Sequence, residues 1–288
     1  NIIETTPTIE SSSIFPPDSD TAWASIYTGR NPANHGVVDF VDPLERNKIN
    51  VKESEYILNY DVKGRTFWDY ASVQDKKCCL IFPHIIYPLY DIQNGFMINP
   101  HPETGNLEIK PEGFLNPEEL QRVKVIKRIP RNKLELSKYA DNKKEVVKSE
   151  FNFLEKMLNK EAWDVTLFYS SVVDSIMHIF WNYCDPEDPT YPGKNKFENV
   201  ILDFYILYDK LVGEILEKYG NDYNVIIMSD HGHYRRPTNL FNINELLKQK
   251  GYLKAKGKSN IISVKSKLKR LAVDIAQRSG LRPFAQTI

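Results

Sequence analysis

The chain has 288 residues, of which 41% are hydrophobic and 26% are charged. This length and composition are typical of a globular protein with one large or two small domains and a sizeable core. The 38 basic and 38 acidic side chains give a formal net charge of zero, which excludes an overall basic nucleic-acid-binding domain, and no apolar run approaches the roughly 20 residues of a transmembrane helix.

Short apolar runs bounded by turns or charges predict buried strands, and longer periodic segments between them predict helices. The strand candidates are residues 77–82, 164–170 and 224–230, with a weaker one at 6–12; the helix candidates are 23–28, 67–73, 144–159 and 197–219. Gly220 provides the stop signal for the last helix. Because strands alternate with helices, we expect an α/β fold with a mostly parallel sheet sandwiched by helices.

Composition divides the chain into three parts. Residues 1–82 and 143–250 are predicted to form the α/β core. Residues 83–142, rich in Pro, Lys and Glu with several turn signals, are predicted to be an inserted cap at one edge of the sheet. Residues 251–288 carry nine Lys and Arg against one acid, a net charge of +8. We expect this tail to form a helix that packs on the body; contact with anionic lipid or nucleic acid is the alternative.

The first segment that can carry chemistry surrounds Ser19. Pro16 and Pro17 disfavour a helix before it, so Ser19 or Asp20 falls where a helix N-cap belongs. The free N–H groups and positive dipole end of a helix suit a phosphate, and they also favour a serine alkoxide. The alternative is that Ser19 only caps the helix.

Two further segments pair a carboxylate with an imidazole. Asp174 and His178 directly follow a predicted strand, and their spacing of four places them on one helical face. Asp230 and His231 end the most apolar predicted strand, and ligands of open α/β sheets bind at such carboxyl ends. Each pair could hold a divalent metal, whereas a chance pairing or a turn capped by Asp230 is the simpler alternative. Together with Ser19 they match the needs of a two-metal phosphoryl-transfer site.

These segments resemble the type I phosphodiesterase/nucleotide pyrophosphatase branch of the alkaline-phosphatase superfamily. In that family the Thr or Ser nucleophile lies nine residues before the Thr of a Thr-Gly pair, which here gives Ser19 before Thr28. Asp174-x-x-x-His178 followed by Phe180-Trp181 is similar to the family's second metal segment, and Ser229-Asp230-His231-Gly232 to its third. The similarity also covers residues 67–69, 87–95 and 251–253.

The resemblance implies a metal-dependent phosphodiester hydrolase that acts on a small phosphorylated substrate. Ser19, Asp230 and His231 would bind one divalent ion, and Asp174 and His178 the other. Zinc is expected, with manganese or iron as alternatives. The implied mechanism is attack of the Ser19 alkoxide on phosphorus, followed by hydrolysis of the phosphoseryl intermediate by a water that the second metal activates.

The chain also departs from the family pattern. The resemblance calls for a further Asp before the nucleophile and a further His downstream, and neither is found, so we expect a fragment cut at both ends or a degenerate relative. His233 could in principle substitute for the missing His, but it lies two positions from His231 and is expected to point elsewhere. Ala22 replaces an Asn that contacts phosphate in the family, and the acidic Asp18 and Asp20 flank the nucleophile.

Other readings of the same residues stay open. A phosphomutase or a sulfatase of the same superfamily is one alternative, and a non-catalytic binding protein on the same scaffold is another. His35 is expected to be structural, and His84 and His101 are given no role. Cys78, Cys79 and Cys184 offer neither a disulfide framework nor a CxxC zinc pair, and we expect a cytoplasmic setting for a chain that begins without signal-peptide features.

Overall fold

The computed structural model describes residues 7–38, 62–102, 104–121, 123–124, 129–130, 132–235 and 241–254. The chain divides into two compact units. Unit one comprises residues 1–127, 145–170 and 210–232, and unit two comprises residues 128–144, 171–209 and 233–288. Helices α6 (Leu136–Lys160) and α8 (Val200–Tyr219) contribute residues to both units.

Unit one is built on a four-stranded sheet. Its strands are β1 (Cys78–Ile81), β2 (Gly95–Pro100), β3 (Leu107–Lys110) and β4 (Val165–Phe168), in the order β3-β2-β1-β4. Strand β1 pairs in parallel with both β2 and β4, and only β3 runs antiparallel to its neighbour β2. The expected α/β fold with a mostly parallel sheet is therefore confirmed, as are the strands predicted at 77–82 and 164–170.

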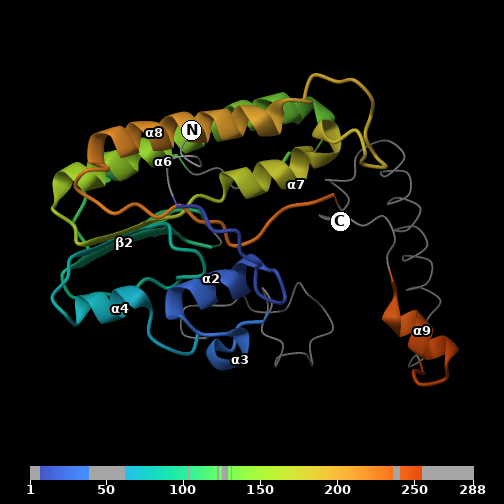
Figure 1. Cartoon of the computed structure of the whole chain (residues 1–288), viewed down its shortest axis with the longest axis horizontal. Helices are drawn as coiled ribbons and strands as arrows, with labels where there is room; N and C mark the ends of the chain where they lie inside the picture. Colours follow the sequence, from blue (N-terminus) through green and yellow to red (C-terminus); the bar gives the residue numbers. More distant parts are fainter. Residues whose placement is uncertain are drawn as a thin grey trace. The chain divides into compact units, whose positions relative to one another are not determined.

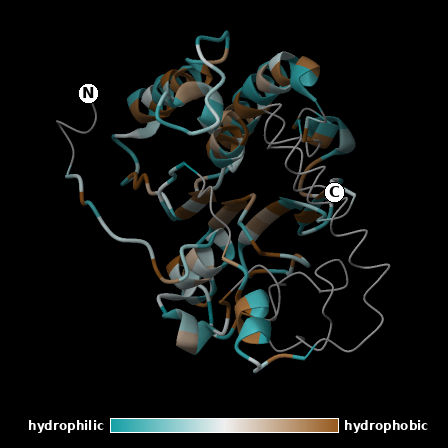
Figure 2. Ribbon diagram, turned by 90° about the vertical axis from the view of Figure 1, so that its right-hand side faces the viewer, coloured by the Kyte–Doolittle hydropathy of each residue, from teal (hydrophilic) through white to brown (hydrophobic). Residues whose placement is uncertain are grey.

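Helices cover both faces of this sheet (Figure 1), and the strands between them are largely apolar (Figure 2). Cys78 and Leu80 face one layer, which includes aromatic side chains of α2 (Ser19–Thr28) and α4 (Phe67–Ser72). Cys79 and Ile81 face the other, which includes Phe153, Leu154 and Met157 of α6. A strand covered on both faces must be apolar at every position, which explains the uninterrupted run in β1.

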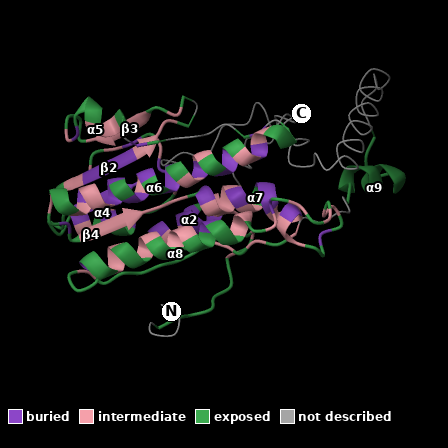
Figure 3. Cartoon of the chain, turned by 90° about the horizontal axis from the view of Figure 1, so that it is seen from above, coloured by how far each residue is buried: buried purple, intermediate pink, exposed green. Residues whose placement is uncertain are grey.

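The remaining elements are short apart from one helix. Unit one also contains α3 (Pro32–His35) and α5 (Pro117–Gln121), and unit two contains the 3-10 helix η4 (Lys133–Glu135), α7 (Val172–Cys184) and α9 (Ile243–Gln249). Figure 3 shows that β2 is largely buried, whereas α9 is exposed along its length. The four predicted helices are all present, at α2, α4, α6 and α8, although α6 begins eight residues earlier than expected.

The strand predicted at 224–230 is wrong. This segment forms no regular structure, and the side chains of Val225, Ile226, Ile227 and Met228 are 41–78% exposed. An apolar run becomes a strand only where a neighbouring strand pairs with it, and the described sheet ends at β4. The weaker candidate at 6–12 is also wrong for its described residues 7–12, which are exposed and irregular.

The segment 83–142 contributes more to the sheet than its composition predicts. It supplies β2 and β3, and Phe96, Met97 and Ile98 of β2 are fully buried in the core. Its many Pro and turn residues lie around these short strands and mask them in the sequence. The predicted three-part division as a whole stays a prediction, and residues 255–288 of the predicted tail lie outside the described part of the chain.

The three cysteines are free. Burial raises the pKa of the Cys78 thiol to about 11, and that of Cys79 rises further, so both remain protonated at neutral pH. These residues act as small apolar side chains of the central strand. Among the described residues, no helix is both long enough and apolar enough to cross a membrane.

His35 ties α3 to α2, as expected of a structural histidine. Its imidazole is fully buried, its Nδ1 accepts a hydrogen bond from the Val37 N–H at 3.1 Å, and its Nε2 lies 2.8 Å from Ser25 Oγ. Because Nδ1 accepts, the neutral ring carries its proton on Nε2, which donates to Ser25. Ser25 in turn donates to the Thr21 carbonyl at 3.1 Å. His35 therefore cannot act as a base toward Ser25.

Burial lowers the pKa of His35 below its ordinary value of 6.5. The unfolded chain therefore takes up the proton first, and the free energy of unfolding should fall as the pH drops from about 6.5 toward the lowered pKa. The slope from this group is at most about 1.4 kcal/mol per pH unit. Urea unfolding between pH 7.5 and 5.5 should show this loss, and the variant His35→Gln should lack it. Equal slopes in the two proteins would contradict the assignment.

Candidate active site

Ser19 is the first residue of α2, and Asp18 is the N-cap. The Asp18 carboxylate accepts a hydrogen bond from the Asp20 N–H at 3.0 Å. The prediction that Ser19 or Asp20 caps the helix is therefore wrong by one or two positions, because the two prolines leave Asp18 in the extended conformation that a cap requires. The Ser19 hydroxyl is not used for capping and lies 2.9 Å from His231 Nε2.

The orientation of the His231 ring follows from its other nitrogen. Nδ1 lies 2.9 Å from the Gly232 carbonyl oxygen, which can only accept, so Nδ1 carries the proton. In the neutral ring, Nε2 then presents a lone pair and accepts the hydrogen bond that Ser19 Oγ donates. The same Nε2 lies 3.5 Å from Asp230 Oδ2. The imidazole thus faces Ser19 and Asp230 with its basic nitrogen.

Asp230 completes a group of three ligand atoms. Its Oδ2 is buried and has no hydrogen-bond partner among the residues that the structure describes. Burying a carboxylate oxygen without a donor is unfavourable, and the lone pair of His231 Nε2 beside it adds repulsion. A cation bound by Ser19 Oγ, Asp230 Oδ2 and His231 Nε2 would relieve both, and the oxygen and nitrogen donors suit a divalent metal. The residues present therefore fit the metal that the sequence predicts at this place.

The N-terminus of α2 is anchored at the carboxyl end of the sheet. His84, which follows β1, lies 2.6 Å from Asp20 Oδ1 through its Nε2, and its backbone N–H donates to the Tyr27 hydroxyl at 2.9 Å. Trp23 packs edge-on against Tyr169, which follows β4, with ring centroids 5.0 Å apart. No local pattern in the sequence singled out His84, because its partner Asp20 is 64 residues away. This pairing also engages one of the two acids that flank Ser19.

The backbone of Asp230 is fixed from outside the sheet. Ser13 Oγ donates to the Asp230 carbonyl at 2.7 Å, and Ser229 Oγ donates to the His231 carbonyl at 2.8 Å. Asp230 and His231 were expected at the end of a strand, but these side-chain contacts hold an irregular segment instead. His231 nevertheless reaches Ser19, and Asp230 Oδ2 lies beside the same ring nitrogen.

A second group of ligand atoms lies in unit two. Asp174 and His178 occupy one face of α7, as their spacing predicted, with Asp174 Oδ1 3.2 Å from His178 Nε2. His233 joins them, and one ligand atom from each of the three residues lies within 4.8 Å of the others. His233 was expected to point elsewhere than His231, and its ring lies against α7 beside the two predicted ligands. Its offset of two from His231 carried no signal, because only the folded chain brings it to α7.

The predicted ligands thus form two groups. Ser19, Asp230 and His231 meet in unit one, and Asp174 and His178 meet in unit two with His233. That all of them line a single two-metal pocket stays a prediction.

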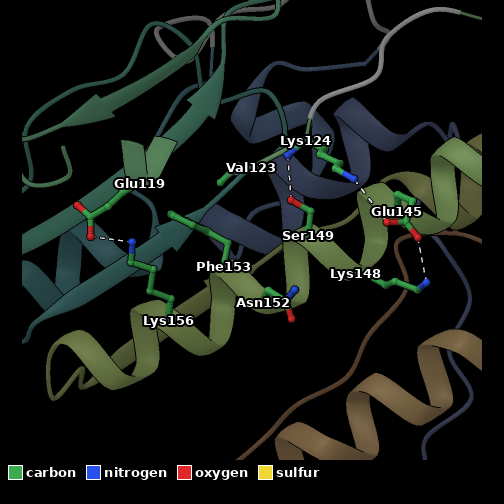
Figure 4. Close-up of a pocket in the computed structure, with 9 residues that line it drawn as sticks. All are labelled: Glu119, Val123, Lys124, Glu145, Lys148, Ser149, Asn152, Phe153 and Lys156. Atoms are coloured by element: carbon green, nitrogen blue, oxygen red, sulfur yellow. Dashed lines mark hydrogen bonds and ion pairs between the residues drawn. The ribbon is translucent and has the colours of Figure 1, made fainter. Parts of the chain in front are cut away.

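A cavity of about 500 Å³ lies in unit one between helix α6 and the part of the chain that runs from α5 to Lys124 (Figure 4). Its charged side chains are paired with one another: Glu119 with Lys156 at 2.6 Å, and Glu145 with Lys124 and Lys148 at 3.4 and 2.9 Å. The Lys156 ammonium is the main cause that lowers the pKa of Glu119 to about 2. None of the predicted site residues lines this cavity, and its ion pairs offer no nucleophile.

Comparison with known proteins gives one match. The sequence model of the type I phosphodiesterase / nucleotide pyrophosphatase family matches residues 5–279. No curated protein and no solved structure matches the chain. The matched range covers both groups of ligand atoms.

The capping geometry separates the roles of two neighbouring residues. Asp18→Ala removes the helix cap, and we expect it to lower the free energy of unfolding by about 1 kcal/mol. Ser19→Ala should change it by less than about 0.5 kcal/mol, because the hydroxyl does not cap the helix. Urea unfolding of the metal-free protein measures both. A larger loss for Ser19→Ala than for Asp18→Ala would show that Ser19 is the cap.

Proposed function

Because the chain belongs to the type I phosphodiesterase/nucleotide pyrophosphatase family, a family of phosphoester hydrolases, we propose that it is a metal-dependent phosphodiester hydrolase with Ser19 as its nucleophile. The observation that carries this proposal is the meeting of Ser19 Oγ, His231 Nε2 and the unpartnered Asp230 Oδ2. A serine that only capped α2 would need neither neighbour.

Two divalent cations fit the donor atoms of the two groups. Ser19, Asp230 and His231 would hold one, and Asp174 and His178 the other. Bound there, the cations would lower the pKa of the serine hydroxyl and of a water molecule and neutralise charge on the phosphoryl oxygens. Oxygen and imidazole donors without thiolates fit zinc, manganese or iron.

The chain's own groups account for the positioning of the reaction. Ser19 stands at the first turn of α2, where unsatisfied N–H groups and the helix dipole favour a phosphoryl group. The Ser19 oxygen would form a bond to phosphorus while the ester bond to the leaving alcohol breaks. The phosphorylated Ser19 would still carry the second alcohol of the diester. Water would then cleave the bond between Ser19 Oγ and phosphorus, releasing the phosphate monoester of that alcohol and restoring the hydroxyl. His84 keeps the Asp20 carboxylate engaged during these steps.

The fold supports the same proposal independently of the family. In open α/β sheets, ligands bind outside the carboxyl ends of the strands. Helix α2 begins beside the residues that follow β1 and β4, because His84 and Tyr169 contact its side chains. A small phosphorylated substrate, the class on which the family acts, would therefore approach at this edge.

Removal of the nucleophile is the first test. Ser19→Ala should lower the rate of hydrolysis of bis(p-nitrophenyl) phosphate by more than about 10³-fold, since the attacking atom is lost. The matched control is Thr21→Val, two residues on, which keeps the side-chain shape and removes a buried hydroxyl that has no hydrogen-bond partner among the described residues. The control should retain the rate. After the reaction is quenched and the protein is digested, mass spectrometry should find a p-nitrophenyl phosphoryl group on Ser19. Activity of Ser19→Ala equal to that of the unaltered chain would refute the proposal.

Removal of metal is the second test. Dialysis against a chelator should abolish hydrolysis, and zinc, manganese or iron(II) should restore it, because the Asp230 and His231 donors would otherwise face each other without a cation. Asp230→Asn should need a higher zinc concentration for half-maximal recovery than the unaltered chain. Full activity in the chelated protein would contradict a metal-dependent reaction.

A further inference from the structure

We propose that His233 is the third protein ligand of the metal held by Asp174 and His178, so that unit two contains a complete three-ligand site. This inference rests on the proposed function, which places a metal at Asp174 and His178. It goes beyond the proposed function in naming His233 as the third ligand, a role that its spacing of two from His231 did not predict.

The geometry of the three side chains supports a common metal. Asp174 Oδ1 and His178 Nε2 are already 3.2 Å apart, close to the roughly 3.3 Å that separates two ligands at about 2 Å from a tetrahedral ion. One ligand atom of His233 lies within 4.8 Å of both.

The chemistry of the set is that of a catalytic rather than a structural metal. Two imidazoles and one carboxylate are a three-protein-ligand combination typical of zinc hydrolases, which leave the fourth position for water or substrate. The side chains of His178 and Asp174 are 47% and 37% exposed, so solvent can reach that position. A set of two protein ligands alone would leave the ion only weakly held.

Two aromatic side chains of α7 pack against the His233 ring and position it. Trp181, one turn after His178 on α7, packs against the His233 ring with centroids 5.1 Å apart, and its indole N–H donates to Asp185 at 3.0 Å. His178 meets the same ring edge-on at 4.8 Å. These contacts are made by packing of the rings, whereas metal coordination would involve a ring nitrogen of His233.

The two proposed metals are linked along the chain by one short segment. Gly232 alone separates His233 from His231 in the sequence, so one short segment would supply ligands to both proposed metals. An ion bound at either position would order the backbone that carries a ligand of the other. Zinc binding at the two positions should then be positively coupled.

The test separates coordination by His233 from its packing. In the full chain, His233→Phe keeps an aromatic ring against Trp181 and His178 but has no nitrogen ligand. Isothermal titration with zinc should find two sites in the unaltered chain and a loss of at least about 100-fold in affinity at one of them in the variant, because even an indirect partner of a ligand contributes 10–100-fold. His101→Phe, a histidine outside both groups, is the matched control and should bind as the unaltered chain does. Melting curves of the three metal-free proteins should coincide, which would show that the substitutions leave the fold unchanged.

A spectroscopic measurement identifies the affected site directly. Copper(II) bound near Trp181 should quench its fluorescence, and Trp181→Phe identifies that part of the signal. In His233→Phe the quenching should require a much higher copper concentration, whereas in His233→Asp, which restores a ligand oxygen, it should recover in part. Unchanged quenching in His233→Phe would overturn the inference.

The outcomes for Asp174→Asn distinguish this inference from the proposed function. If Asp174→Asn abolishes one zinc site and His233→Phe leaves both intact, the third ligand is not His233, although the two-metal proposal stands. If neither substitution affects zinc binding, no metal binds at Asp174, and both the inference and the two-metal proposal fail.

Discussion

Burial of β1 on both faces constrains most of unit one. Each of its four residues is fully buried, with aromatic side chains of α2 and α4 on one face and α6 on the other. A strand enclosed in this way cannot carry polar groups within the sheet, so the polar residues of the same chain segments lie beyond the strand ends. His84 and Tyr169 occupy those positions after β1 and β4, and both contact α2. The packing that excludes water from the sheet is thus also what places the first turn of α2 at the carboxyl edge.

Electrostatics explains why the group around Ser19 differs from an ordinary helix start. At most N-termini, a serine hydroxyl satisfies a free backbone N–H. Here the Asp18 carboxylate takes that role, and the hydroxyl turns to His231. The proton on His231 Nδ1 is fixed by the Gly232 carbonyl, so Nε2 accepts from Ser19 and the adjacent Asp230 Oδ2 is left buried without a donor. Such an arrangement is unfavourable by itself and becomes favourable when a cation binds. The local instability is therefore interpretable as a preorganised metal site.

Comparison of two Ser–His contacts shows how the hydrogen-bond network determines whether a ring nitrogen donates to a serine or accepts from it. Ser25 and His35 lie as close together as Ser19 and His231, at 2.8 and 2.9 Å. In the first pair the ring nitrogen donates, because the Val37 N–H occupies the other nitrogen. In the second pair the ring nitrogen accepts, because the Gly232 carbonyl holds the proton on the other nitrogen, Nδ1. Burial then lowers the pKa of His35, which keeps it an uncharged structural group. Distance alone would have assigned the two pairs the same role.

The sequence by itself determined the α/β class, the strands β1 and β4, the four main helices, and the residues Ser19, Asp174, His178, Asp230 and His231 as candidates. These follow from local periodicity, from helix spacing and from short motifs, all of which a linear chain displays. Tertiary structure decided the rest. The apolar run at 224–230 is not a strand, because no described strand pairs with it, and β2 is central although turn residues surround it in the sequence. His84 meets Asp20, and His233 meets Asp174 and His178, across separations of more than 50 residues. Such contacts depend on how the chain returns on itself, and no local pattern specifies that path.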